Sequence, residues 1–375
     1  MIQPDTTLIK LAGIGSYLPN DPVPFERITD ILGTLDDAPP KIQKWIEKTS
    51  LLMKEMLGID YYYYAIDPVT REFTDDNITM AYKASVKALD NAHMVASDID
   101  CIVYGAPYMF EMPSPSAKLQ AMLGIESCAE LSIHANCTSI YKAILVASDM
   151  IRCGRYRTVL VATSNMSSST LRAEYYNQAV VKKEDLFLRW YLCDGAGALV
   201  VTGADTKENG FYITSNYMES VGGKKPSAMY MRYPSMYVSP REIFDKGDHH
   251  LVQAFQDELS KNFHEDGGTV FHKGLQRMIA AYAIDISKIA ALQINMPTKH
   301  VVDLIADECA AAGIARDRLY TAIDKCGYAG PPAAIISLDT LLKEKQFTSG
   351  DIILSFVAEV SKFLLAGFTV EYFEN

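Results

Sequence analysis

Two stretches of this sequence repeat one another, and the repeat constrains the fold more than any other feature. Residues 97–107 read SDIDCIVYGAP, and residues 287–297 read SKIAALQINMP, at a constant spacing of 190 positions. Both stretches begin with serine, have isoleucine at their third position and end with proline. The same helix–strand–helix order surrounds each copy, as expected of an internal duplication. The chain is therefore predicted to fold as two similar halves.

Short apolar runs alternate with longer segments of helical periodicity along both halves. Strands are predicted at residues 8–19, 98–107, 130–136, 157–164, 287–297, 351–360 and 362–373. Helices are predicted at residues 76–92, 117–125, 138–152, 270–284, 298–313 and 331–344. Alternation of this kind is typical of an α/β protein with a mixed or parallel sheet.

We divide the chain into an N-terminal half, residues 1–205, and a C-terminal half, residues 206–375. Within the second half, residues 215–268 form an irregular segment rich in glycine, proline, serine, methionine and tyrosine. A long irregular segment in a compact protein is usually a functional loop or lid. We therefore expect it to contact a substrate or a partner, and the alternative is a surface insertion.

The net charge of -11 argues against nucleic acid or an anionic membrane as a partner, because both attract a positive surface. No uninterrupted apolar stretch reaches the length of about 18 residues that a membrane-spanning helix needs. The first residues, MIQPDTTLIKLAGIG, lack the basic start and apolar core of a signal peptide. These features predict a cytoplasmic protein.

Neither the cysteines nor the histidines show a metal-binding pattern. The seven cysteines are odd in number and include no CxxC pair, which favours free thiols over a disulfide framework. The seven histidines show no HExxH motif and no paired spacing with cysteine. We therefore predict no metal site.

Cys137 lies between the strand predicted at 130–136 and the helix predicted at 138–152. The unpaired N–H groups at a helix N-terminus carry partial positive charge, which favours a thiolate. A thiolate there can attack a thioester, with backbone N–H groups stabilising the tetrahedral oxyanion. The alternative is a buried structural cysteine.

His134 lies three residues before Cys137, on the predicted strand. A His/Cys pair would be an activated nucleophile. Contact across the bend from strand to helix is not guaranteed by this spacing, and buried histidines are usually satisfied internally. We therefore interpret His134 as a core residue and not as a catalytic partner.

Two motifs carry a resemblance to a known family. Residues 134–164 read HANCTSIYKAILVASDMIRCGRYRTVLVATS, and residues 191–201 read YLCDGAGALVV. Their order resembles that of ketoacyl-ACP synthase III-type members of the thiolase superfamily, in which a nucleophilic cysteine heads a buried helix and an Asp-Gly-Ala-Gly-Ala segment follows. The resemblance extends over roughly residues 8–373.

The resemblance implies a layered αβαβα fold of two duplicated halves, in a protein that is usually dimeric. It also implies acyl transfer from a thioester through an acyl-cysteine intermediate on Cys137. The acyl donor would be acyl-CoA or an acyl carrier protein, used as a co-substrate, and no permanently bound cofactor is expected.

Two family residues are replaced in this chain. Asn295, in Asn-Met-Pro-Thr, stands where the family has a histidine, and Tyr328, in Gly-Tyr-Ala-Gly, stands where it has an asparagine. In the family these two residues donate hydrogen bonds to the enolate formed when malonyl groups lose carbon dioxide. Asn295 and Tyr328 can also donate, but an asparagine cannot move a proton near pH 7 as histidine can. Decarboxylative condensation is therefore weakened.

The closing part of the chain also departs from the family. Glu359, in Phe-Val-Ala-Glu-Val, lies near the position of a glycine-rich turn that supplies an oxyanion-hole N–H in the family. Its N–H can still serve, and its carboxylate is a candidate base if burial raises its pKa. The alternative is a surface or dimer contact. His300 stands where the family often has an arginine near the channel mouth, and we expect it at the rim.

No residue is assigned to binding the coenzyme A nucleotide. Where the family has arginines, this chain has methionine and tyrosine in LLMKEMLGIDYYYYAID, residues 51–67. Basic side chains elsewhere are candidates for contact with an acidic carrier, although each is by default a solvated surface residue: Lys44, Lys48, Lys54, Arg152, Arg155 and Arg157.

Three functions are compatible with these residues. The first is an acyltransferase of specialised metabolism that passes an acyl group from Cys137 to a small-molecule or carrier-bound acceptor. The second is a ketoacyl synthase that forms carbon–carbon bonds with Asn295 and Tyr328 as oxyanion donors. The third is a non-catalytic subunit of a heteromeric acyltransferase. A homodimer or a hetero-oligomer of related subunits is expected.

Overall fold

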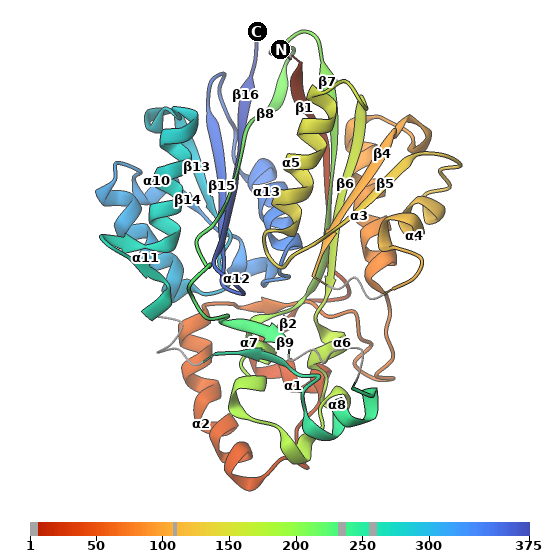
Figure 1. The fold of residues 1–375 in the computed structure, drawn as a ribbon, viewed down its shortest axis with the longest axis vertical. Coiled ribbons are helices and arrows are strands. Elements are labelled where there is room, and N and C mark those ends of the chain that lie inside the picture. Colours follow the sequence, from red (N-terminus) through yellow and green to blue (C-terminus); the bar gives the residue numbers. More distant parts are fainter. Residues whose placement is uncertain (1–6, 108–110, 232–237, 255–260) are drawn as a thin grey trace.

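The computed structural model describes residues 7–107, 111–231, 238–254 and 261–375. Its main feature is a ten-stranded sheet that consists of two sets of five strands (Figure 1). The first set has the order β1 (Leu8–Tyr17), β7 (Asp194–Ala204), β6 (Thr158–Met166), β4 (Cys101–Ala106) and β5 (Ala129–His134). The second set has the order β8 (Gly210–Ser220), β16 (Leu364–Phe373), β15 (Ile352–Glu359), β13 (Ile289–Ile294) and β14 (Leu319–Tyr320).

The two sets repeat the same topology. In each set, the first strand is antiparallel to the second and the second to the third, whereas the last three are parallel. The sets meet between β1 and β8, where only Lys10↔Tyr212 and Leu11↔Phe211 are paired. This arrangement agrees with the duplicated α/β fold predicted from the repeat. The division at residues 205 and 206 falls in the turn between β7 and β8 and stays a prediction.

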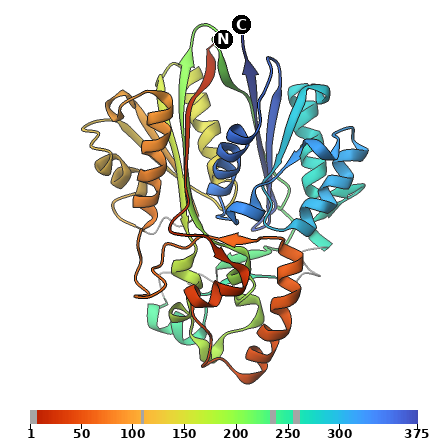
Figure 2. The same cartoon turned by 180° about the vertical axis from the view of Figure 1, so that it is seen from behind.

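Helices form three layers around the two sets of strands (Figures 1 and 2). The central layer consists of α5 (Ser139–Arg152) and α13 (Pro332–Glu344), which contact strands of both sets. The outer layers consist of α3 (Asn77–Ala92) and α4 (Pro115–Met122) on one side and of α10 (Val270–Tyr282) and α11 (Lys299–Ala311) on the other. The result is the αβαβα layering of a thiolase-type fold.

The composition of α5 explains its central place. Its apolar residues recur at helical spacing on a broad face, and Ile140, Ile144 and Ile151 are buried there. Gly105 on β4 allows the helix start to approach the sheet, because a Cβ at this position would lie 2.6 Å from the carbonyl oxygen of Ser139. This close approach fixes the position of the residue that precedes the helix, Cys137.

The irregular segment predicted at 215–268 is only partly irregular. Its first six residues belong to β8, because that strand pairs with β16 as far as Ser220. The rest includes β9 (Met229–Met231), α8 (Pro240–Lys246), β10 (Leu251–Gln253), β11 (His264–Glu265) and β12 (Gly268–Thr269). Residues 232–237 and 255–260 lie outside the described residues. The expectation of a wholly irregular segment was therefore wrong.

A smaller part of the molecule lies beyond one end of the sheet (Figures 1 and 2). It contains α1 (Ile28–Leu32), α2 (Pro40–Leu57), α6 (Ser168–Leu171) and α7 (Leu188–Tyr191), together with α8 and the β9–β10 pair. We call it the lower part. The strand β3 (Tyr61–Tyr62) pairs with β2 (Val23–Pro24) along its boundary. None of the helices in the described ranges is both long and apolar enough to cross a membrane.

Candidate active site

The two central helices begin close together, and the reactive residues lie at these starts. Cys137 immediately precedes Thr138, the N-cap of α5. Tyr328 lies in the turn between α12 (Ile323–Cys326) and α13. The Tyr328 hydroxyl donates a hydrogen bond to the Cys137 sulfur at 3.1 Å. The structure thus brings together two of the residues that the sequence singled out, although they are 191 positions apart.

Cys137 and Tyr328 line a cavity that we call the chamber. Its wall comes from the central helix starts and from the lower part, with Leu188, Met229 and Leu251 among its apolar residues. Its polar side chains are all neutral in formal charge among the described residues, and they include Asn136, Asn165, Tyr191 and Gln253. An apolar wall with a few polar groups is typical of a small-molecule site.

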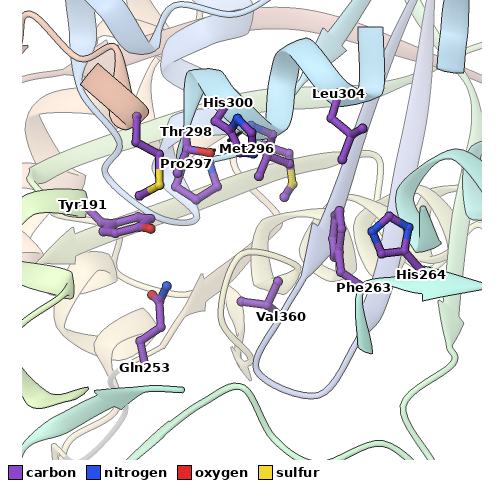
Figure 3. Close-up of a pocket in the computed structure, with 12 residues that line it drawn as sticks. Tyr191, Gln253, Phe263, His264, Met296, Pro297, Thr298, His300, Leu304 and Val360 are labelled. Carbon is purple, nitrogen blue, oxygen red and sulfur yellow. Dashed lines mark hydrogen bonds between the residues drawn. The ribbon is translucent and has the colours of Figure 1, made fainter. Parts of the chain in front are cut away.

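A second cavity adjoins the chamber, and we call it the vestibule (Figure 3). The two cavities share Tyr191, Gln253, Met296, Pro297 and Val360. The outer wall of the vestibule includes Phe263, His264 and Leu304. His300 also lines it and is exposed, which agrees with the expected rim position. A substrate entering from the vestibule would pass the shared residues before it reached the Cys137 sulfur.

The environment of the Cys137 sulfur corrects the expected thiolate. Burial, and after it the negative charge of Glu359, raise the pKa of the Cys137 thiol to about 12. The hydrogen bond from Tyr328 acts in the opposite direction and lowers this pKa. Near pH 7 the thiol therefore holds its proton, and the helix N-terminus does not create a resting thiolate.

Glu359 adds to the effect of burial on the Cys137 pKa, because it places a negative charge at the start of α5. Its carboxylate Oε2 accepts hydrogen bonds from the Thr138 backbone N–H at 2.9 Å and from the Thr138 hydroxyl at 2.5 Å. The Ser361 hydroxyl donates to the other oxygen. Glu359 is buried, and this carboxylate at the start of α5 offsets the positive end of the helix dipole. The surface or dimer contact considered for Glu359 is therefore wrong for this chain.

Asn295 follows β13 and is buried, but no hydrogen bond from it to Cys137 is present among the described residues. Its side-chain nitrogen has no hydrogen-bond partner in the part of the chain that the structure describes. The nearest polar network contains Tyr141, whose hydroxyl lies 2.9 Å from that of Ser355. Burial raises the pKa of Tyr141, whereas Ser355 and Asn295 lower it. The Asn295 amide therefore acts on Tyr141, and Asn295 is not among the residues that line the chamber.

Tyr141 and Asp194 were missed as parts of the site. Tyr141 lies four residues after Cys137, and this spacing places both on one helical face, which was the available signal. Asp194 is fully buried and accepts hydrogen bonds from the Ser168 and Ala65 backbone N–H groups, both at 2.8 Å. Burial raises the pKa of Asp194 to about 6. The neighbouring Cys193 N–H donates to the Tyr328 carbonyl oxygen at 3.1 Å, so this segment supports the Tyr328 turn.

His134 is not a core residue, which corrects that interpretation. It ends β5, an edge strand on which alternate side chains are exposed, and His134 is one of the exposed ones. It has no hydrogen bond to Cys137 among the described residues. Within the same residues, no group of three or more His, Cys, Asp or Glu side chains is arranged to hold a metal ion.

Comparisons with known proteins were made for sequence and for structure. A family model described as 3-Oxoacyl-[acyl-carrier-protein (ACP)] synthase III matches residues 131–222, a minority of the chain. A beta-ketoacyl-[acyl-carrier-protein] synthase III from Clostridium perfringens (strain SM101) is 25% identical over 357 residues, which cover 92% of this chain and 94% of the relative.

Two solved structures have a similar fold. AbyA1, a tetronic acid condensing enzyme, superposes with a TM-score of 0.78 at 15% identity, covering 97% of this chain and 99% of that one. The 3-oxoacyl-[acyl-carrier-protein] synthase III from Aquifex aeolicus superposes with a TM-score of 0.72 at 18% identity, covering 98% of this chain and 100% of the other. The comparisons confirm the resemblance found in the sequence, and the chain is similar to acyl-transferring, condensing enzymes.

Proposed function

We propose that this ketoacyl synthase III-like protein is an acyltransferase that carries its acyl group on Cys137. The observation that supports the proposal is the hydrogen bond from Tyr328 to the Cys137 sulfur at the bottom of the chamber. A donor aimed at the sulfur stabilises negative charge on it, both when it attacks a thioester and when it is expelled later. The acyl donor would be acyl-CoA or an acyl carrier protein, and the wall of the chamber suits a neutral acyl group.

A base must accept the proton of the Cys137 thiol during the attack, because this thiol has a pKa of about 12 and is protonated near pH 7. We assign this role to Glu359, the buried carboxylate whose charge acts on the thiol. As the sulfur forms its bond to the acyl carbon, the proton passes to Glu359, and the bond to the donor sulfur breaks. Glu359 then returns the proton to the departing thiolate. The second transfer, from acyl-Cys137 to the acceptor, restores the thiol.

The proposal is tested by intact-protein mass spectrometry after incubation with acetyl-CoA, hexanoyl-CoA and the matching N-acetylcysteamine thioesters. We expect a gain of one acyl mass, located by peptide mapping on Cys137. Cys137→Ala should gain none, whereas Cys153→Ala, at an exposed thiol, should gain as much as the wild type. Failure of every donor to acylate the wild type would overturn the proposal, and activity that survives Cys137→Ala would favour the non-catalytic subunit.

Carbon–carbon bond formation is a second candidate, and Asn295 favours it. The side-chain nitrogen of Asn295 is buried and acts on Tyr141, and Asn295 directly precedes Met296 in the chamber wall, so its amide is a candidate donor to an enolate oxygen. The relative from Clostridium perfringens also bears the name of a ketoacyl synthase. Release of carbon dioxide from malonyl thioesters by the wild type, lost in Asn295→Ala, would support this candidate over acyl transfer to a heteroatom.

A further inference from the structure

The polar side chains of the chamber differ in whether they already have partners. Tyr328 donates to the Cys137 sulfur. Gln253 hydrogen-bonds to Tyr191 and lowers the pKa of this tyrosine, which burial raises to about 12. Asn165 also lines the chamber, but its side-chain oxygen Oδ1 is buried and has no partner among the described residues. Asn165 therefore has an unpaired hydrogen-bond acceptor and lines the same cavity as the nucleophile.

The orientation of the Asn165 amide is fixed by its nitrogen. Asn165 lies near the end of β6 and is 3% exposed. Its Nδ2 donates to the Ser167 hydroxyl at 2.7 Å and to the Ala329 carbonyl oxygen at 3.0 Å. A carbonyl oxygen can only accept a hydrogen bond, so the atom that faces Ala329 is the nitrogen. The unpaired atom is therefore the acceptor Oδ1.

The Asn165 amide contacts the turn that carries Tyr328, the residue hydrogen-bonded to the nucleophile. Ala329 directly follows Tyr328, so the amide of Asn165 is held against the turn whose tyrosine contacts the sulfur. A buried acceptor without a donor is unfavourable, and a ligand that supplies an N–H or O–H removes this penalty. A site built in this way discriminates strongly against ligands that lack the donor.

We propose that Asn165 Oδ1 accepts a hydrogen bond from the N–H or O–H of the acyl acceptor, which identifies the acceptor class as a neutral amine or an alcohol. This inference rests on the proposed function and adds the acceptor to it. The nitrogen or oxygen lone pair attacks the acyl carbon of acyl-Cys137, the carbon–sulfur bond breaks, and the acceptor proton passes to the sulfur. The attacking carbon of an enolate formed by decarboxylation carries no N–H or O–H, so a contact at the attacking atom distinguishes the two candidate reactions.

The test separates loading of Cys137 from its discharge. Acyl-Cys137 is prepared in the wild type, Asn165→Ala and Ser167→Ala, and its decay is followed by mass spectrometry with benzyl alcohol or hydroxylamine. We expect the loaded fraction of Asn165→Ala to discharge to both probes at least about tenfold more slowly than that of the wild type. Ser167→Ala removes one partner of Nδ2 and leaves Oδ1 in place, so it should discharge within about threefold of the wild type.

A second measurement needs no substitution and remains valid if Asn165→Ala does not fold. In the unmodified wild type, benzyl alcohol and benzyl methyl ether compete with iodoacetamide for Cys137, and only the alcohol has an O–H. We expect the alcohol to protect at a concentration at least about tenfold lower. Equal protection, equal discharge by Asn165→Ala, or an equal loss in Ser167→Ala would each overturn the inference. Failure to form acyl-Cys137 would instead count against the proposed function, and the protection result would remain informative.

Discussion

The starts of the two central helices occupy corresponding places in the two halves, but they are built differently. At α5, a cysteine precedes the helix, and the carboxylate of Glu359 receives the Thr138 N–H. At α13, two prolines open the helix and no side chain caps it. The turn before α13 is held instead by hydrogen bonds to its backbone carbonyls, from the Cys193 N–H to Tyr328 and from the Asn165 side-chain amide to Ala329.

The contacts at both helix starts cross from one half to the other. Glu359 and Tyr328 belong to the second half and act on the nucleophile of the first. Cys193 and Asn165 belong to the first half and hold the turn of the second. Each half therefore positions the reactive group of the other, and Glu359 and Tyr328 shift the Cys137 pKa in opposite directions.

The largest expected effect is the slow reaction of Cys137 with iodoacetamide. A thiol with a pKa near 12 is about three pKa units above an ordinary cysteine, so its thiolate fraction at pH 7 should be lower by about 10³. We expect its alkylation rate, measured by peptide mapping, to be lower than that of glutathione by this order. The rate should also keep rising above pH 9, where an ordinary thiol levels off. A plateau below pH 9 would show that the second half does not suppress the thiolate.

Replacing Tyr328 by phenylalanine should slow the alkylation of Cys137 by iodoacetamide further. The variant loses the donor that lowers the Cys137 pKa and keeps the aromatic ring that packs beside it. A hydrogen bond to a charged group is worth about 1.5–3 kcal/mol, so alkylation at fixed pH should fall by about 10- to 100-fold. Tyr191→Phe, at a chamber tyrosine that does not donate to the sulfur, serves as the matched control. An unchanged alkylation rate in Tyr328→Phe would show that the Tyr328 hydroxyl does not lower the Cys137 pKa.

Replacing Glu359 by glutamine should change the rate of Cys137 alkylation in the opposite direction. The variant keeps an oxygen that can accept from Thr138, but it loses the charge that raises the Cys137 pKa. Alkylation should therefore become faster, by about tenfold for each pKa unit that is removed. Acylation by a thioester should become slower, because the proposed proton acceptor is gone. If both reactions accelerate, the role of Glu359 is only electrostatic.

The smallest effect is expected for Asn295→Ala. Its amide lowers the pKa of Tyr141 and has no hydrogen bond to the Cys137 sulfur among the described residues. The rate of Cys137 alkylation should change by less than about threefold, because Asn295 acts on Tyr141 and not directly on the sulfur. Peptide mapping after timed exposure to the same reagent provides the comparison. A loss as large as that of Tyr328→Phe would mean that the two residues act as one unit.

Much of the fold could be predicted from the sequence, because it depends on local periodicity. The helix predicted at 138–152 is α5, and the strand predicted at 287–297 contains β13. The segment 215–268 was harder, since its first residues complete a strand by pairing with β16, which lies far along the chain. Such pairing depends on distant residues and leaves a weak local signal.

Some residues of the candidate site could be predicted from the sequence, whereas Tyr141, Asp194 and the electrostatics of the site could not. The positions of Cys137 and Tyr328 follow from the order of motifs, and the structure places them in contact. The raised pKa of Cys137 could not be predicted, because Glu359 lies 221 positions from Thr138 and only the tertiary fold brings them together. His134 was misjudged because a sequence does not reveal that β5 is an edge strand.

The narrow pairing between β1 and β8 has a consequence for how the molecule can be divided. Only two residue pairs join the two sets of strands directly. The chain can be divided in the turn from Ala204 to Gly210 without interrupting a strand. If the protein were expressed as two fragments divided there, Cys137 would lie on one fragment, and Tyr328 and Glu359, which shift its pKa, would lie on the other. Reassembly of the fragments would then slow the alkylation of Cys137, because burial and the charge of Glu359 raise the pKa of this thiol and Glu359 lies on the other fragment.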